Sequence, residues 1–234
     1  MQIPRYEIKI PCEPHRLPQI QALVRLHPAH WRVAYPPRQI NNIYFDTPDH
    51  QALNGNLSGA GVRSKLRLRW YGPCLHTVAG ARLELKHKEG MVGGKGIWPI
   101  HTRLDLANTA WPEVRQTIRQ VAGTQADPWL AQFACPVLIN HYQREYYATA
   151  DQKVRLTIDT KLQAFDQRFS DCPNLRRPAV ITDCMIVELK APADHVSYQR
   201  LVQVLAHFPL RPDRHSKYVQ GMLAAPDFDG VDLL

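Results

Sequence analysis

The feature that most constrains this chain is a set of short segments in which charged and apolar residues alternate. In KLRLRWY (residues 65–71) every second residue is Lys, Arg or Tyr, and the residues between them are Leu or Trp. A period of two is typical of a β-strand with one buried face. ARLELKHK (81–88) has Leu83 and Leu85 between charged residues in the same way. Both segments therefore predict strands that are apolar on one face and charged on the other.

The alternation returns in RYEIKI (5–10), KVRLTID (153–159) and IVELK (186–190), and more loosely in HYQREYY (141–147). Cations outnumber carboxylates on the charged faces of these strands. The cations are Lys9, Lys65, Arg67, Arg69, Lys86, Lys88, Arg144, Lys153, Arg155 and Lys190, and the carboxylates are Glu7, Glu84, Asp159 and Glu188. The sequence thus predicts a sheet with one strongly basic face.

Two architectures fit such a sheet. In the first, the charged residues lie on the solvated face of an ordinary antiparallel sheet. In the second, the sheet closes into a barrel with a charged lumen, and helices cover its apolar outer face; closure also removes the unpaired strand edges. A lumen of the second kind would hold a polyanion.

Composition narrows the class of partner and of protein. The net charge of +8 over 234 residues favours an acidic partner, which could be nucleic acid, an anionic membrane surface or a phosphorylated small molecule. No Gly/Ser-rich or Pro-rich linker divides residues 1–234, so one domain is predicted. Five cysteines without a C-x-x-C pair argue against a disulfide framework and a cysteine zinc site. Without a signal peptide or a run of ~18 apolar residues, a soluble, cytoplasmic protein is expected.

The periodicities predict an α+β fold of about eight strands with flanking helices. Strands are expected at 5–10, 39–46, 62–71, 82–88, 97–102, 137–148, 153–162 and 181–191. Helices are expected at 13–27, 111–121, 129–133 and 196–208, with a short helical turn at 49–53 and a short segment at 215–223. The glycine-rich stretch 54–61 lacks the Lys-Ser/Thr of a P-loop and is expected to be a flexible connection. A second glycine-rich stretch, 89–96, is expected to be a turn that carries Lys95.

Several of these segments, taken in order, resemble a known family. The segments are RYEIKI (5–10), NNIYFDTP (41–48), KLRLRWYG (65–72), ELKHK (84–88) with Lys95, YQREYY (142–147), VRLTIDT (154–160), VELKAP (187–192) and HSKY (215–218). Together they resemble the polyphosphate-polymerase domain of the vacuolar transporter chaperone (VTC) family, one of the triphosphate tunnel metalloenzymes. The resemblance implies a closed antiparallel barrel whose basic lumen binds triphosphate or polyphosphate with Mn²⁺ or Mg²⁺. It also implies transfer of the γ-phosphate of ATP to a polyphosphate chain.

The resemblance also implies roles for individual residues. The catalytic cations would be Lys9, Arg67, Arg69, Lys86, Arg144 and Arg155. Further phosphate-binding residues would be Lys65, Lys88, Lys95, Lys190, Arg214, Ser216 and Lys217. Glu188 would bind the metal, whereas Glu7, Glu84 and Asp159 are expected to hold cations in place through salt bridges.

The sequence also leaves two other functions open. The same tunnel would make a triphosphatase if water reached the γ-phosphate, although the first strand has Glu7 and Lys9 without the E-x-E-x-K of CYTH-type triphosphatases, which favours the polymerase branch. The chain could also bind polyphosphate without turnover. Nucleic acid is disfavoured because few aromatic residues, Tyr71, Tyr142 and Tyr146, share the charged faces. The sequence carries no sign of a membrane-protein partner, and it does not give the oligomeric state, the product length or the choice of metal.

Overall fold

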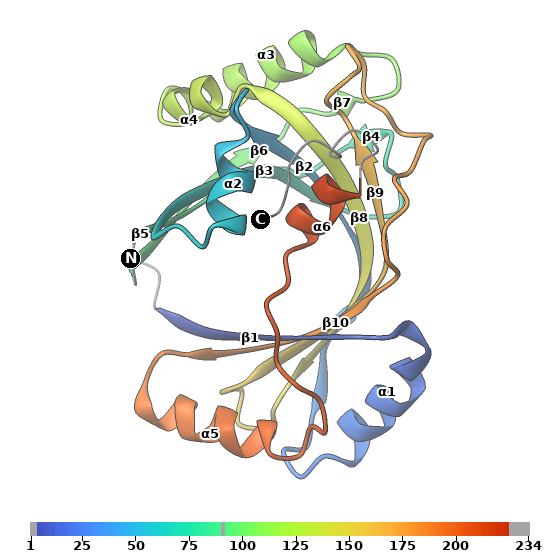
Figure 1. Cartoon of the computed structure of the whole chain (residues 1–234), viewed down its shortest axis with the longest axis vertical. Coiled ribbons are helices and arrows are strands. Elements are labelled where there is room, and N and C mark those ends of the chain that lie inside the picture. Colours follow the sequence, from blue (N-terminus) through green and yellow to red (C-terminus); the bar gives the residue numbers. More distant parts are fainter. Residues whose placement is uncertain (1–3, 90–91, 225–234) are drawn as a thin grey trace. The chain divides into compact units, whose positions relative to one another are not determined.

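A computed structural model describes residues 4–89 and 92–224 of the chain (Figure 1). The chain forms two compact units, each built from three separate stretches. Unit 1 comprises Met1–Arg38, Tyr142–Leu162 and Thr182–His215. Unit 2 comprises Gln39–His141, Gln163–Ile181 and Ser216–Leu234. Because residues far apart in sequence share a unit, neither unit corresponds to one continuous half of the chain.

Eight strands form one hydrogen-bonded sheet in the order β1-β10-β9-β8-β2-β3-β5-β6. Their bounds are β1 Arg5–Cys12, β2 Arg32–Asp46, β3 Val62–Tyr71, β5 Ala81–Glu89, β6 Val92–Ile100, β8 Cys135–Ala148, β9 Arg155–Asp166 and β10 Met185–Pro192. Two short strands, β4 (Thr77–Val78) and β7 (Leu104–Asp105), form a separate antiparallel pair. The predicted α+β fold with about eight antiparallel strands is confirmed. The order begins at β1 and ends at β6, so barrel closure would require these two strands to pair.

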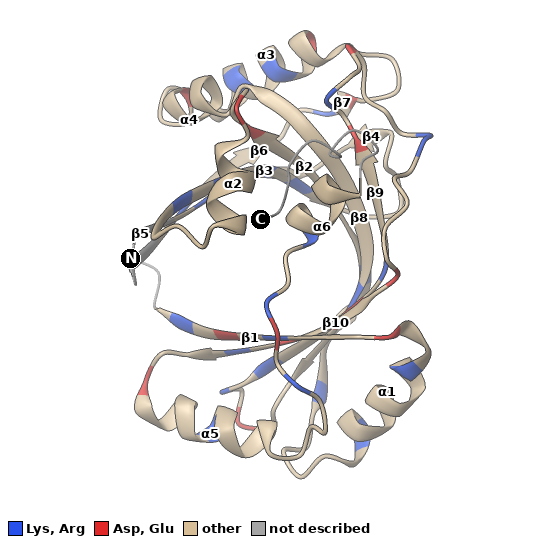
Figure 2. Ribbon diagram, viewed as in Figure 1, with Lys and Arg blue, Asp and Glu red and all other residues tan. Residues whose placement is uncertain are grey.

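The helices of unit 1 cover the apolar face of its strands. They are a short 3₁₀ turn η1 (Pro14–Arg16), α1 (Leu17–Leu26) and α5 (His195–Leu205). Ile20 of α1 and Leu201 of α5 belong to the same buried cluster as Leu156 and Leu189 of the strands. Figure 1 shows α1 and α5 beside β1 and β10, and Figure 2 shows charged residues along β1. The alternating sequence of these strands thus places the charged residues on the face opposite the helices.

Unit 2 has helices on both sides of its strands. They are α2 (Gln51–Leu57), α3 (Trp111–Ala122), α4 (Asp127–Gln132) and α6 (Lys217–Leu223). Trp111 and Ile118 of α3 are buried in one cluster with Leu66 and Leu83, so α3 covers the apolar face. Figure 1 shows α2 and α6 on the other side of the strands from α3 and α4. Helix α6 therefore lies on the side where the charged residues project.

The alternation predicted for the strands is confirmed by burial of the leucines between the charged residues. Each of these leucines is at most 5% exposed, and the set is Leu66, Leu68, Leu83, Leu85, Leu156 and Leu189. They lie in the apolar core of their own unit. Removal of these apolar side chains from water supplies the main favourable free energy that holds the helices on the strands of each unit.

Several element boundaries differ from the sequence prediction. β2 begins at Arg32 instead of residue 39, and β10 begins at Met185 instead of residue 181. Residues 54–57 belong to α2 instead of a flexible connection, and most of 89–96 extends β5 and β6, so Lys95 lies in a strand. Lys153 precedes β9, which begins at Arg155, so Lys153 is not a strand-face cation. No helix in the described part of the chain is both long enough and apolar enough to cross a membrane.

Candidate functional site

Rows of cations cross the strands of unit 2. Lys65 of β3 lies opposite Lys86 of β5, and Lys86 lies opposite Lys95 of β6. Two same-face positions further along, Arg69 lies opposite Arg82, and the pair between these two rows is Arg67 and Glu84. Residues directly opposite each other have Cβ atoms about 5 Å apart, and like charges in such positions destabilise a sheet. A folded sheet that keeps these rows is well suited to bind a polyanion, because an anion would relieve the repulsion.

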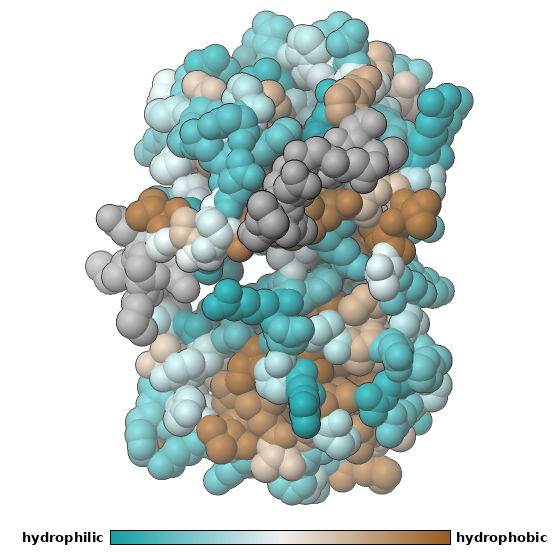
Figure 3. All heavy atoms as spheres, viewed as in Figure 1, coloured by the Kyte–Doolittle hydropathy of each residue, from teal (hydrophilic) through white to brown (hydrophobic). Residues whose placement is uncertain are grey.

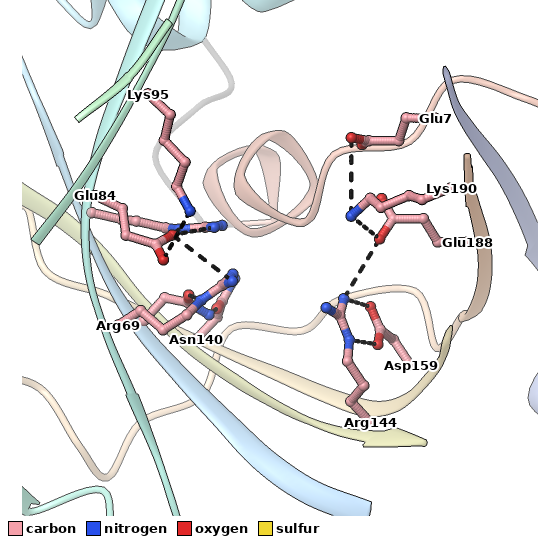
Figure 4. A network of polar contacts seen from close by, with 11 residues as sticks. Glu7, Arg69, Glu84, Lys95, Asn140, Arg144, Asp159, Glu188 and Lys190 are labelled. Carbon is pink, nitrogen blue, oxygen red and sulfur yellow. Dashed lines mark hydrogen bonds and ion pairs between the residues drawn. The ribbon is translucent and has the colours of Figure 1, made fainter. Parts of the chain in front are cut away.

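Glu84 is the carboxylate within this basic face. Its Oε2 atom accepts hydrogen bonds from Arg67 Nη2 at 2.6 Å and Nε at 3.0 Å, and it lies 3.9 Å from Arg69 Nη1. Its Oε1 atom lies 3.3 Å from Lys95 Nζ. Figure 4 shows Arg69 and Lys95 pointing toward this carboxylate. Glu84 therefore fixes the positions of three cations while neutralising one charge.

The ionisation of Glu84 and Lys95 reflects both burial and these contacts. Burial raises the pKa of Glu84, but Arg67, Arg69 and Lys95 outweigh it and lower that pKa to about 2. Burial lowers the pKa of Lys95 below its ordinary value, and the attraction of Glu84 opposes this only in part. At neutral pH Glu84 is thus a firmly ionised anchor for the cations around it.

A pair of buried amides orients Arg69. Asn42 Oδ1 accepts a hydrogen bond from Arg69 Nε at 2.9 Å, and Asn42 Nδ2 donates to Asn140 Oδ1 at 2.8 Å. Both asparagines are fully buried. Because Asn42 engages the Nε side of the guanidinium, the Nη groups are directed toward Glu84. Sequence reasoning missed this pair, although Asn42 lies in NNIYFDTP, one of the segments that carried the family resemblance.

The segment that contains Ser216 is attached to the basic face of unit 2. Lys65 Nζ donates to Ser216 Oγ at 3.1 Å and lies 5.4 Å from the ring centre of Tyr218. The Tyr218 hydroxyl donates to the carboxylate of Asp46, which is completely buried. Burial and the charge of Asp46 raise the pKa of Tyr218 far above its ordinary value, so Tyr218 stays protonated and donates. Lys217 begins α6 directly after Ser216.

Asp46 also organises the start of α2. Its Oδ1 atom accepts hydrogen bonds from the backbone of Thr47 and Ala52, each at 2.8 Å, and its Oδ2 atom accepts from the backbone of Leu53 at 3.2 Å. The first N–H groups of a helix have no partner within the helix, so this carboxylate satisfies two of them. A single buried side chain therefore joins β2, α2 and α6.

Unit 1 carries a second polar cluster, centred on Arg144. Its Nε and Nη2 atoms donate to the two oxygens of Asp159 at 2.5 and 2.6 Å, and Nη2 lies 3.8 Å from Glu188 Oε2. Burial lowers the pKa of Arg144, but interactions with Tyr142, Asp159 and Glu188 outweigh it and raise that pKa well above its ordinary value. This two-pronged pairing fixes the guanidinium plane.

Lys190 lies between two carboxylates of the same cluster. Its Nζ atom is 2.8 Å from Glu188 Oε2 and 4.0 Å from Glu7 Oε2, as Figure 4 shows. Glu7 also lies 3.2 Å from Lys9 Nζ, and Lys9 Nζ donates to the backbone oxygen of His215 at 3.0 Å. Glu7, Glu84 and Asp159 thus hold cations in place, as the sequence predicted.

The remaining predicted residues are distributed over both units. In unit 1, Arg155 of β9 lies opposite Lys190 of β10. Arg214 follows Asp213 in the chain, and the backbone N–H of Asp213 donates to the backbone oxygen of Lys9 at 2.9 Å. The side chain of Lys88 lies outside the described residues. Sequence reasoning also missed Asp46 and Tyr218; both lie in segments that carried the family resemblance, and only their contacts reveal their roles.

A divalent metal fits the unit 1 cluster only together with other ligands. Within residues 4–89 and 92–224 there is no group of three or more His, Cys, Asp or Glu side chains placed to bind a metal. Mg²⁺ and similar hard cations are commonly held by one or two carboxylates plus substrate phosphates and water. Glu188 and Glu7 both lie near the ammonium group of Lys190, so these two carboxylates could serve as the protein ligands of such a cation.

Comparison with known families identifies the family of this chain. A family model named VTC domain matches residues 4–225. The chain belongs to the VTC domain family. A search of curated protein sequences gives no match.

Solved structures show that other proteins share this fold. A Vibrio parahaemolyticus protein described as an adenylate cyclase candidate is 13% identical, with a TM-score of 0.52 over 96% of this chain and 100% of that chain. A Hippeastrum protein described as an adenylyl cyclase candidate with a dominant triphosphatase activity is also 13% identical, with a TM-score of 0.51 over 91% of this VTC domain and 93% of its own chain. At this identity the similarity establishes the fold alone.

Proposed function

We propose that this VTC domain is a polyphosphate polymerase that transfers the γ-phosphate of ATP to a growing polyphosphate chain. The observation that carries the proposal is the basic face of unit 2, where Lys65, Lys86 and Lys95 form one row and Arg67 and Arg69 share Glu84. Such a concentration of cations is costly for a sheet unless a polyanion binds it. Closure of the eight strands into a barrel, as in a triphosphate tunnel, is part of the proposal.

Phosphoryl transfer fits residues of this kind. The protein contributes little covalent chemistry, because the reaction needs in-line positioning and neutralisation of charge on the phosphate oxygens. Arginine can grip a phosphate with two parallel hydrogen bonds, and lysine supplies a mobile point charge. The fixed guanidinium groups of Arg67, Arg69 and Arg144 would orient phosphates. The more mobile lysine side chains would keep contact with the polyphosphate as phosphates are added.

The proposal assigns roles to residues of both units. The catalytic cations are Lys9, Arg67, Arg69, Lys86, Arg144 and Arg155. The additional phosphate-binding residues are Lys65, Lys88, Lys95, Lys190, Arg214, Ser216 and Lys217. Glu188, with Glu7 beside it, would hold Mn²⁺ or Mg²⁺ together with the substrate phosphates. When bound, the metal would neutralise charge on the transferred phosphate.

A triphosphatase is the second candidate. The same cations would bind triphosphate, and water instead of a phosphate chain would accept the γ-phosphate. The Hippeastrum protein that shares this fold is described as having triphosphatase activity, which supports keeping this alternative. A non-catalytic polyphosphate-binding module would have the same basic face but no turnover.

The test is to incubate the full chain with ATP and Mn²⁺ or Mg²⁺ and to separate the products. A polymerase yields acid-labile chains longer than three phosphates, a triphosphatase yields orthophosphate, and a binding module yields neither. Arg67→Gln should abolish the product in the first two cases. Arg119→Gln is the matched control, because Arg119 pairs with Asp127 on the exposed surface of α3 and α4. If orthophosphate is the sole product, the polymerase proposal is wrong and the activity is that of a triphosphatase.

A further inference from the structure

Unit 1 carries a group of aromatic and cationic side chains that the phosphate-binding residues do not include. The Arg38 guanidinium lies 5.5 Å from the ring centre of Tyr35 and 4.9 Å from that of Tyr146. The two rings meet edge to face, with centroids 5.7 Å apart. All three residues belong to unit 1.

This group is unusually exposed for a cluster of aromatic residues. Tyr35 is 56% exposed, Arg38 is exposed, and Tyr146 is half-buried. Figure 3 shows another hydrophobic area of unit 1, between α5 and α1. The pair Tyr35–Tyr146 differs from that area because the Arg38 guanidinium lies beside both rings while Tyr35 stays exposed. An exposed Tyr face beside an Arg guanidinium is the surface on which nucleic-acid bases stack.

The strand places this group next to a proposed phosphate-binding residue. Tyr142, Arg144 and Tyr146 alternate along β8, so their side chains project to the same face. Tyr146 is two residues from Arg144, which corresponds to about 6.6 Å along a strand. A ribose and a phosphate bridge a separation of that order. Arg144 also lies 5.3 Å from the ring centre of Tyr142, so cations and aromatic rings interleave along this strand.

We infer that Tyr35, Arg38 and Tyr146 form a subsite for the base of a nucleoside triphosphate, whose phosphates extend toward Arg144. This inference rests on the proposed function and makes it more specific. It predicts that the chain distinguishes a nucleoside triphosphate from inorganic triphosphate, which has no base. The planar guanidinium and the exposed ring of Tyr35 supply stacking area, which purines fill better than pyrimidines.

Binding of two ligands that differ only in the base and ribose tests the subsite. Dissociation constants are measured by calorimetry in EDTA buffer for the β,γ-imido analogue of ATP and for inorganic tripolyphosphate. In Tyr35→Ala, the analogue should bind about tenfold more weakly, the effect of one lost stacking contact, whereas tripolyphosphate binding should change by less than about twofold. Arg38→Lys keeps the charge but loses the planar group, so it should show the same difference. Should Tyr35→Ala fail to fold, Arg38→Lys carries the test.

Tyr198→Ala is the matched control. Tyr198 lies on α5, is 48% exposed and contacts the ring of Tyr6, so its loss removes an exposed aromatic pair without touching the subsite. Both ligands should bind this variant as they bind the wild type. Equal weakening of both ligands in Tyr35→Ala and Arg38→Lys would overturn the inference, as would unchanged binding of the analogue. If the wild type binds tripolyphosphate but not the analogue, the base subsite is wrong and the phosphate site stands; if it binds neither, the proposed function is wrong as well.

Discussion

The hydroxyl of Tyr218 donates a hydrogen bond to the buried carboxylate of Asp46, 172 residues earlier in the chain. The ring of Tyr218 lies under Lys65 Nζ, and the same ammonium group donates to Ser216. One hydrogen bond therefore connects the core of unit 2 to two of its proposed phosphate-binding residues. We therefore expect Asp46 and Tyr218 to act on the proposed phosphate site by positioning Lys65 and Ser216.

Tyr218→Phe keeps the ring and removes the donor. Because a buried carboxylate oxygen loses its hydrogen bond, we expect the free energy of unfolding to fall by about 1–3 kcal/mol. Tripolyphosphate affinity should fall as well, since the Ser216 segment is less firmly held. Urea denaturation and calorimetry measure the two effects. Tyr198→Phe, at an exposed position, should change neither; an unaltered stability of Tyr218→Phe would show that Asp46 does not depend on this bond.

Glu84 predicts a specific acid dependence of stability. Its pKa is lowered from 4.5 to about 2 in the folded protein, so its ionised form favours folding. That contribution is fully present above pH 4.5 and is lost as the pH falls toward 2. The shift corresponds to a contribution on the order of 3 kcal/mol. Glu84→Gln should therefore be less stable than the wild type at pH 6, and the difference should shrink as the pH falls through this window.

Chemical denaturation of both proteins between pH 2 and 7 measures this difference. Glu113→Gln is the control, because Glu113 lies exposed in the first turn of α3. A difference between wild type and Glu84→Gln that stays constant over this range would contradict the assigned ionisation.

Lys86→Gln separates stability from ligand binding. Lys86 lies between Lys65 and Lys95, so removal of its charge relieves two unfavourable pairs. We expect the unliganded variant to be more stable by up to about 1 kcal/mol. Tripolyphosphate should bind about tenfold more weakly, because one charge-assisted contact is lost. Lys161→Gln, at an exposed position on β9, should change neither quantity; reduced stability in Lys86→Gln would show that the contacts of Lys86 in the unliganded sheet are favourable on balance.

Tripolyphosphate should stabilise the wild-type protein against unfolding. A ligand that binds only the folded state contributes about 2.7 kcal/mol at a hundredfold excess over its dissociation constant. The increase should be smaller in Lys86→Gln than in Lys161→Gln at the same concentration. Thermal melts at moderate salt measure it, and an unchanged melting temperature with millimolar tripolyphosphate would argue against the basic face as a phosphate site.

Glu188→Gln separates binding from turnover. It keeps the size of the side chain but removes the charge that would recruit a divalent metal, so turnover should fall by at least ~10²-fold. Tripolyphosphate binding without metal should persist or tighten, because the cluster around Lys190 becomes more positive. Near-normal turnover would remove Glu188 from the metal site, and parallel loss of binding and turnover would indicate that it only pairs with Lys190 and Arg144.

The sequence by itself determined which face each strand presents. The alternation of Leu66 and Leu68 with Arg67 and Arg69 is a local property of the backbone, because successive side chains of a strand point to opposite faces. Burial of the leucines in the core is confirmed. The same local signal, with the ordered motifs, was sufficient for the family and the antiparallel fold.

Only the tertiary structure decided which charges meet. From the sequence, Glu84 could have formed an ion pair with any nearby cation. The register of the strands places Arg67, Arg69 and Lys95 beside its carboxylate. The helix at residues 51–57 has glycine and asparagine in its sequence, and it forms because Asp46, outside it, satisfies its first N–H groups. The inferred base subsite likewise depends on the distance between Tyr35 and Tyr146 on neighbouring strands. Contacts of this kind join residues far apart in the chain, so their geometry is set by the packing of the whole unit and leaves no periodic trace in the sequence.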